Sequence, residues 1–400
     1  MDSAPITTVT GMTEPLQFRG HIPALDGLRG VAVLMVLVCH FWDPAESFIN
    51  LAHPFIGSAL SKATSGCRFG VELFFVLSGF LITGILLDSR GNSNYFRAFY
   101  MRRLLRIFPL YYVALAAIFL ILPKVCNFDL AAQEISSRQF WLWTYLSNGP
   151  WSGGAWDNSH LFHLGHFWSL CVEEHFYLVW PLVVYVATPR RLAIICFTGL
   201  FVCFALRLWQ SMPNSPTLLG WSTLTKLDGL FVGALLAMGC RHVTVANQVC
   251  HWNRFVMMIS CLLTVGLLAL PRKWHGGWWD VVFELPCVIC FGSLVVEALR
   301  FTNSVPTRIL TQGVLRSFGK YSYGIYVIHC LCRPGFQSLF QHEWLLTNLG
   351  SPLVGQLIFY ALTISSSYIL AFASWHLMEK HFLFLKRYFD YKSTAGTISA

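Results

Sequence analysis

Charged residues are scarce in this chain of 400 residues. They make up 12% of it, whereas a soluble protein carries about 25%. Hydrophobic residues make up 55%, above the roughly 45–50% of a soluble chain. No repeat, low-complexity tract or separate polar domain interrupts the apolar segments. The composition excludes a water-soluble globular protein and predicts an all-α integral membrane protein.

Three further absences narrow the possible functions. No basic run with interleaved polar residues stands apart from the apolar segments, so the net charge of +9 does not indicate nucleic-acid binding. The 13 cysteines lie mostly within apolar runs and lack the paired spacing of a zinc site or a redox dithiol. The first twenty residues lack the short apolar core of a cleaved signal peptide. We therefore expect no nucleic-acid partner and no cysteine chemistry.

Segments long enough to cross a bilayer recur along the chain, and we place about ten transmembrane helices. They cover residues 28–45, 69–87, 106–122, 162–187, 191–209, 217–239, 255–271, 279–299, 321–340 and 352–376. Most of the 28 lysines and arginines fall in alternate loops, which the positive-inside rule assigns to the cytosol. Both termini are thus predicted to be cytosolic, with tails at 1–20 and 390–400 around a membrane domain at 21–389.

The segment 25–40, LDGLRGVAVLMVLVCH, carries a histidine deep inside an apolar helix. Arg29 and His40 are separated by three helical turns plus about 20°, so both side chains share one face. They lie roughly 16 Å apart along the axis, about half of a hydrocarbon core about 30 Å thick. An ionisable group at that depth is costly unless it faces a partner or a water-filled cavity, which favours a functional role for His40. The alternative is a neutral imidazole satisfied by a neighbouring helix.

Polar residues on four other predicted spans are expected at the level of His40. They are Glu72 and Ser78 on 69–87, His166, Trp168, Glu173 and Glu174 on 162–187, Asp228 on 217–239, and His329 on 321–340. Adjacent carboxylates at this depth would be very expensive in lipid, which favours an internal polar site. His160, His163 and His166 recur every three residues but drift around a helix, and no carboxylate completes a facial site, so no metal is expected.

A second set of polar residues is predicted at the cytosolic face, namely Asp26, Arg29, Arg102, Arg103 and Arg106. Arg103 and Arg106 are neighbours on a helix surface, which suits two guanidinium groups binding one polyanion. The alternative is that these arginines reach lipid phosphates, and we favour it for Arg102.

Together these segments resemble the acyltransferase-3 family, whose multi-pass membrane enzymes O-acylate sugars and some natural products. The resemblance covers nearly the whole chain. It rests on LDGLRG followed by His40, FGVELFFVLSGFLI with Glu72, Arg-x-x-Arg at 103 and 106, HFWSLCVEEHFYLVWPL with Glu173, LDGLFVGALLA with Asp228, FGKYSYGIYVIH with His329, and SWHLMEKHF with Glu379. Glu72 departs from the family, which often has aspartate there.

The resemblance implies an enzyme of the bacterial plasma membrane that transfers an acyl group, by default acetyl, from cytosolic acyl-CoA to a hydroxyl. The acceptor would be a glycan, a lipid-linked sugar or a glycosylated metabolite. His40 would be the catalytic histidine, and Arg29, Arg103 and Arg106 would bind the CoA co-substrate. No permanently bound cofactor is expected. We assign Asp26, Trp168, Asp228 and His329 to the substrate site. Membrane lipid is expected as a further partner.

Transfer from a thioester to an alcohol needs a base, stabilisation of the oxyanion and a grip on the donor. His40 can accept the hydroxyl proton at neutral pH, and we expect Glu173, or else Glu72, to orient its ring. His40 could instead carry the acyl group covalently. The rival function is a proton-coupled secondary transporter, although no internal symmetry is visible. A non-catalytic membrane subunit is the third interpretation.

Overall fold

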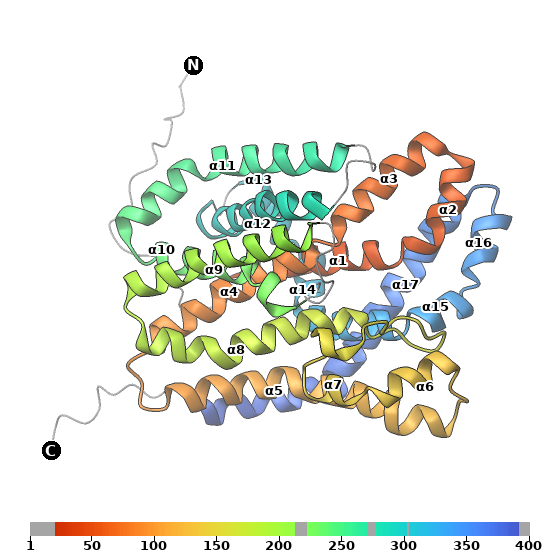
Figure 1. Ribbon diagram of the computed structural model, residues 1–400, viewed down its shortest axis with the longest axis horizontal. Helices are drawn as coiled ribbons and strands as arrows, with labels where there is room; N and C mark the ends of the chain where they lie inside the picture. Colours follow the sequence, from red (N-terminus) through yellow and green to blue (C-terminus); the bar gives the residue numbers. More distant parts are fainter. Residues whose placement is uncertain (1–20, 213–221, 271–276, 302–303, 392–400) are drawn as a thin grey trace.

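The computed structural model describes residues 21–212, 222–270, 277–301 and 304–391 (Figure 1). Apart from residues 390 and 391, the two predicted tails lie outside these ranges. Every regular element within them is a helix, which confirms the all-α prediction.

Ten helices form the body of the molecule, and most of them lie alongside one another in Figure 1. They are α1 (Pro23–His40), α4 (Gly70–Ser89), α5 (Tyr95–Ala116), α8 (Trp168–Val186), α9 (Pro189–Gln210), α10 (Asp228–Gly239), α11 (Val243–Ala269), α12 (Gly277–Arg300), α14 (Gly313–Leu331) and α17 (Pro352–Ser374). Each overlaps one of the ten predicted spans, of which residues 217–221 and 271 lie outside the described ranges. The outermost helices expose apolar side chains, such as Phe201 on α9 and Leu262 on α11, as a helix facing lipid does.

Among the described residues, eight helical stretches are long and apolar enough to cross a membrane, fewer than the ten predicted. The two predicted spans that do not qualify contain α10, which has only 12 residues, and α14, which is richer in polar residues. The ninth span was also misplaced: α14 ends at Leu331, and residues 333–339 form the separate short helix α15. The chain is a multi-pass membrane protein, while the count of ten and the cytosolic termini stay predictions.

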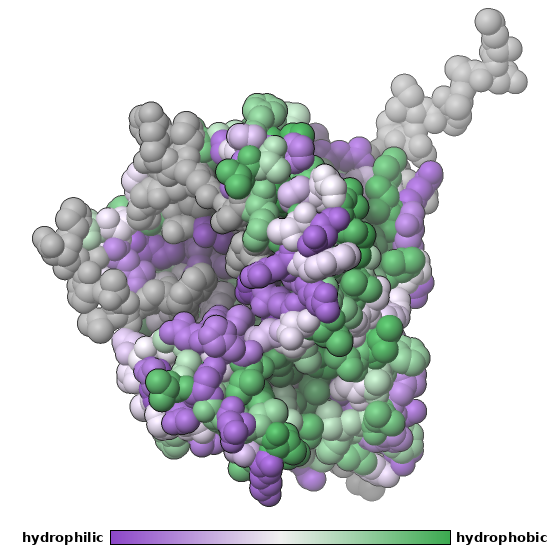
Figure 2. All heavy atoms as spheres, turned by 90° about the vertical axis from the view of Figure 1, so that its right-hand side faces the viewer, coloured by the Kyte–Doolittle hydropathy of each residue, from purple (hydrophilic) through white to green (hydrophobic). Residues whose placement is uncertain are grey.

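The remaining helices are short and connect or cap the long ones. They are α2 (Asp43–Ala52), α3 (Pro54–Cys67), α6 (Leu130–Ser137), α7 (Phe140–Trp143), α13 (Val305–Leu310), α15 (Arg333–Leu339), α16 (His342–Asn348) and α18 (Lys380–Phe384). Several of them, including α2, α3, α6 and α16, gather at the right-hand end of Figure 1. Figure 2 views this end and shows hydrophilic side chains across its middle with apolar side chains on its flank.

Asp129 fixes the long connection between α5 and α8 at this end of the molecule. Its carboxylate accepts hydrogen bonds from the main-chain N–H of His160 (3.0 Å) and of Ala132 (2.6 Å) at the start of α6. These bonds, that of His160 first, lower the pKa of Asp129 below its usual value. The contribution of Asp129 to the order of this connection is therefore present at neutral pH and lost as the pH falls through that lowered pKa.

Glycines bring α10, the short helix, and α14, the helix rich in polar residues, into backbone contact with neighbouring helices. A Cβ atom added to Gly30 on α1 would lie 2.1 Å from the carbonyl oxygen of Leu315 on α14, and one on Gly319 would lie 1.8 Å from that of Asp26. Gly79 on α4 stands in the same relation to Leu230 on α10, at 2.0 Å. Small residues allow membrane helices to approach this closely, so α10 and α14 are held by packing rather than by hydropathy.

We expect Gly319→Ala to lower the free energy of unfolding by about 1–3 kcal/mol, because the new methyl group overlaps a backbone oxygen that cannot move away cheaply. The matched control is Gly266→Ala on α11, where nothing lies within 4 Å of the added carbon. Unfolding titrations in mixed detergent micelles compare the two variants. Equal stability of both would contradict the backbone contact between α1 and α14.

Candidate functional site

A cavity of about 420 Å³, the histidine cavity, surrounds the C-terminal end of α1. His40 lines it together with polar residues from four further helices, and His166, Trp168 and Tyr326 close one side. The polar lining that matters for the chemistry comprises His40, Glu72, His166, Arg207, Lys226 and Glu284. Helices far apart in the sequence thus converge around the predicted catalytic histidine.

A narrower cavity of about 90 Å³, the arginine cavity, lies beside it. Arg29, Arg103 and Arg106 all line this cavity, together with Glu173 and Tyr177. The Arg103 guanidinium lies over the Tyr177 ring, 5.6 Å from its centre. Three guanidinium groups in one hollow can bind a polyanion through several charge-assisted hydrogen bonds.

A third cavity, the basic mouth, has a volume of about 620 Å³ and contains Asp26, Arg316, Lys320 and Glu379 in its lining. It shares Arg29, Arg106 and Tyr323 with the arginine cavity. Glu379 ends a π-helical segment, Trp375–Glu379, that continues α17, and such segments often occur at functional sites.

The three cavities lie next to one another in a row. The arginine cavity shares Val71 and Tyr326 with the histidine cavity, so these two side chains lie at the boundary between them. The Tyr326 hydroxyl donates to the carbonyl oxygen of His166 (3.0 Å) and also contacts the Ser169 hydroxyl at 2.5 Å. The basic mouth, the arginine cavity and the histidine cavity are thus neighbours in this order, and Tyr326 lies between the last two.

Glu173 does not lie where we expected it. It lines the arginine cavity, and its carboxylate accepts a hydrogen bond from the Ser78 hydroxyl at 2.5 Å. The helical rise explains the difference: five residues separate Glu173 from Trp168, which places it about 7–8 Å further along α8 than the histidine cavity. Glu173 therefore lies in a different cavity from His40 and does not pair with it. Our second choice, Glu72, does line the histidine cavity.

His329 is the residue that lies against His40. Its Nε2 atom is 3.3 Å from Nδ1 of His40, and the two ring centres are 5.0 Å apart. The side chain of His329 is completely buried and comes from α14, whose end meets the end of α1. The sequence indicated His329 as a substrate residue, but the pairing needs the glycine-mediated contact of the two helices, which periodicity does not reveal.

Buried charges form an ion network beside the histidine cavity, and four of them, Glu72, Arg207, Lys226 and Glu284, line it. Arg207 on α9 donates to Asp228 on α10 (2.9 Å) and to Glu284 on α12. Lys226 also bonds to Glu284, and its Nζ lies 3.9 Å from the carboxylate of Glu72. Sequence analysis identified Glu72 and Asp228 but missed the other three. An arginine near the end of an apolar span, Arg207, was the signal that could have indicated the network.

The other predicted residues lie at the rim or outside the site. Asp26 lines the basic mouth, where its carboxylate accepts from Arg29 at 3.4 Å. Trp168 lines the histidine cavity and packs edge-on against Phe75. Arg102 instead points toward the C-terminal segment and pairs with Asp390 at 2.5 Å, away from Arg103 and Arg106.

Comparison with known proteins identifies the family of the chain. A family model described as an acyltransferase domain matches residues 22–372, most of the chain. The chain belongs to the acyltransferase-3 family. No solved structure matches it.

Curated relatives are distant. The peptidoglycan O-acetyltransferase OatA of Listeria monocytogenes is 26% identical over 328 residues, which cover 78% of this chain and 49% of OatA. A Bacillus subtilis protein named "Putative peptidoglycan O-acetyltransferase YrhL" is 26% identical over 400 residues, covering 92% of this chain and 56% of YrhL. The chain thus spans about half the length of these relatives.

Proposed function

We propose that this acyltransferase-family protein is a plasma-membrane O-acetyltransferase that moves an acetyl group from cytosolic acetyl-CoA to a hydroxyl of a glycan acceptor. The observation that carries the proposal is the row of adjacent cavities that places three arginines next to the cavity of a half-buried histidine. The relatives support the reaction, since the name of OatA describes acetylation of a glycan. A polyanionic donor such as CoA fits the guanidinium groups better than a neutral or cationic solute does.

The geometry suggests how the donor and the acceptor meet. The CoA phosphates bind in the basic mouth and the arginine cavity, and the pantetheine arm passes Tyr326 toward His40. Along α1 this reach from Arg29 to His40 is roughly 16 Å. The acceptor occupies the histidine cavity, where Trp168 offers an apolar face to a sugar ring and the ion network offers charged partners to its hydroxyls.

In the proposed reaction the acceptor hydroxyl attacks the thioester carbonyl. Its oxygen forms the new ester bond, the carbon–sulfur bond breaks, and the hydroxyl proton passes to Nε2 of His40. That proton then goes to the CoA thiolate, which leaves as the thiol. His40 ends the cycle neutral, and no group outside the donor, the acceptor and the chain is required.

Purified protein in lipid nanodiscs tests the function directly. Acetyl-CoA carrying a labelled acetyl group is supplied with soluble peptidoglycan fragments or chitooligosaccharides, and mass spectrometry follows the glycan. We expect an alkali-labile gain of one acetyl group together with release of CoA thiol. If neither acceptor gains label and no thiol appears, while labelled solutes cross proteoliposomes containing the protein, the carrier function replaces the transferase.

Replacing Arg103 or Arg106 by glutamine should raise the KM for acetyl-CoA about 10- to 100-fold. Each side chain lines the arginine cavity, and a hydrogen bond to a charged group contributes about 1.5–3 kcal/mol. Arg102→Gln is the matched control, because Arg102 lies on the same helix but pairs with Asp390. Steady-state kinetics with acetyl-CoA as the varied substrate separate the three variants. An equal effect at Arg102 would mean that only general surface charge matters.

A further inference from the structure

The hydrogen bonds around His40 and His329 determine which ring nitrogen of each carries a proton. His329 Nδ1 lies 2.7 Å from the carbonyl oxygen of Tyr326 and 3.1 Å from that of Ile325. A carbonyl can only accept, so Nδ1 of His329 is the donor and, in the neutral ring, its Nε2 is an acceptor. A fully buried imidazole favours this neutral form.

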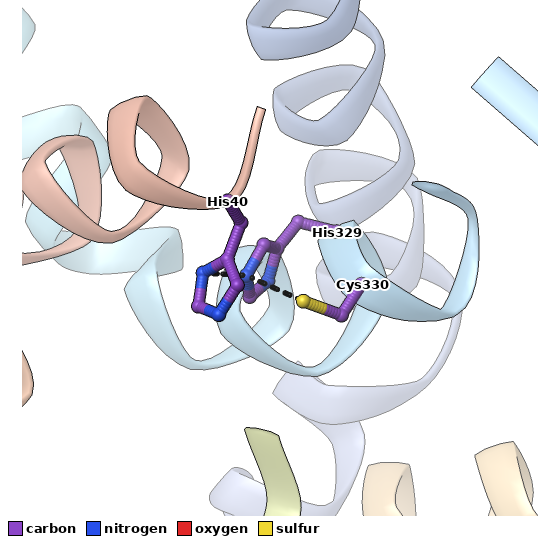
Figure 3. A group of neighbouring side chains, drawn as sticks. All are labelled: His40, His329 and Cys330. Carbon is purple, nitrogen blue, oxygen red and sulfur yellow. Dashed lines mark hydrogen bonds between the residues drawn. The ribbon is translucent and has the colours of Figure 1, made fainter. Parts of the chain in front are cut away.

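The same reasoning fixes His40. Its Nδ1 lies 3.0 Å from the carbonyl oxygen of Val36, one turn earlier on α1, so Nδ1 carries the proton. That proton also faces Nε2 of His329 at 3.3 Å (Figure 3). The neutral His40 ring then has its accepting lone pair on Nε2. This is the tautomer that a general base needs.

The sulfur of Cys330 makes the cluster resemble a metal site, since ligand atoms of His40, His329 and Cys330 lie within 4.8 Å of one another. The hydrogen bonds favour a different arrangement. The His40 atom that faces the other two residues is Nδ1, which donates its proton to Val36 and has no lone pair for a metal. The Cys330 thiol, 3.2 Å from Nε2 of His329, is instead a second donor to that acceptor.

We propose that His329 is the positioning residue of His40, taking the place that a carboxylate holds in a Ser-His-Asp triad. This inference rests on the proposed function, because it explains how the base of that reaction is oriented. When Nε2 of His40 takes the acceptor's proton, the ring becomes positive and its Nδ1–H strengthens its bonds to Val36 and to His329. His329 stays neutral throughout, and no carboxylate is needed beside the base.

Two substitutions at one position test the assignment. Glutamine can place its side-chain oxygen near the site of Nε2 and accept from His40, whereas leucine fills similar space without an acceptor. We expect His329→Leu to lower kcat about 10- to 100-fold and to leave the KM for acetyl-CoA unchanged, as loss of an orienting partner does. His329→Gln should stay within about threefold of the unaltered protein. A merely structural role would not separate the two variants in this way.

A second measurement does not depend on transfer activity. Protein labelled with ¹⁵N-histidine reports the protonated nitrogen of each ring, and the spectrum of the His40→Ala variant identifies the His40 signals. We expect His40 to be protonated at Nδ1, to keep this tautomer in His329→Leu through its bond to Val36 but with a shifted Nδ1 resonance because the second acceptor is gone, and to be unchanged in Glu72→Gln and Glu173→Gln.

The outcomes distinguish this inference from the proposed function. An Nε2-protonated His40, a tautomer that moves with Glu72 or Glu173, or one equivalent of zinc that is lost in His329→Leu overturns the role of His329. A protein that shows the expected tautomers but transfers no acetyl group refutes the proposed function. The inference that His329 orients the His40 ring is then unaffected.

Discussion

We expect His40→Ala to abolish acetyl transfer, with kcat falling about 10²- to 10⁴-fold or more, the range that a positioned general base contributes. The side chain is half-buried at the end of α1, so its removal leaves the glycine contacts between α1 and α14 in place. The variant should therefore insert and purify like the unaltered protein, and its KM for acetyl-CoA should not rise. Retained turnover in a folded His40→Ala protein would remove this residue from the mechanism.

The same variant separates direct transfer from an acyl-histidine relay. Protein incubated with labelled acetyl-CoA without an acceptor is quenched and digested, and the peptide containing residues 30–40 is analysed by mass spectrometry. Direct attack predicts no labelled peptide, because His40 only takes a proton. A labelled adduct that His40→Ala lacks would establish the relay.

Much of the fold follows from hydropathy, because each long apolar run needs a helix to satisfy its backbone in lipid. Two elements, α10 and α14, do not follow from hydropathy, and α14 shows why. The stretch 321–340 was read as a single span, although α14 begins at Gly313 and ends at Leu331. Its polar residues face other helices instead of lipid, so the helix is stabilised by contacts such as that of Gly319 with Asp26. Those contacts are long-range and leave no periodic signal.

The sequence predicts several residues that form the site, but it does not predict which of them contact one another. Placing residues by depth correctly put His40, Glu72 and His329 together, since depth follows from the position along a span. Placement by depth was wrong for Glu173, because a side chain about one and a half turns further along α8 lies in another cavity. It also could not find Arg207 and Glu284, whose pairing depends on which helices are neighbours.

Arg207→Met should lower the free energy of unfolding by about 3–5 kcal/mol. Glu284 keeps its bond to Lys226, but the buried carboxylate of Asp228 loses its ion-pair partner, and an uncompensated buried charge costs about that much. Arg207 is 7% exposed and Asp228 1%, so water cannot take over the lost bonds. Mixed-micelle unfolding titrations measure the loss against Arg102→Met, whose exposed pair with Asp390 should contribute at most about 1 kcal/mol.

The double variant Arg207→Met/Asp228→Asn decides why the first one is unstable. Asparagine removes the stranded charge while keeping the volume, so the double variant should recover part of the lost stability if charge is the cause. If the double variant loses as much unfolding free energy as the two single variants together, Arg207 contributes by packing alone. A recovered fold that still fails to acetylate the glycan would locate acceptor binding at the ion network, because neither change alters a residue that lines the arginine cavity or a member of the histidine pair.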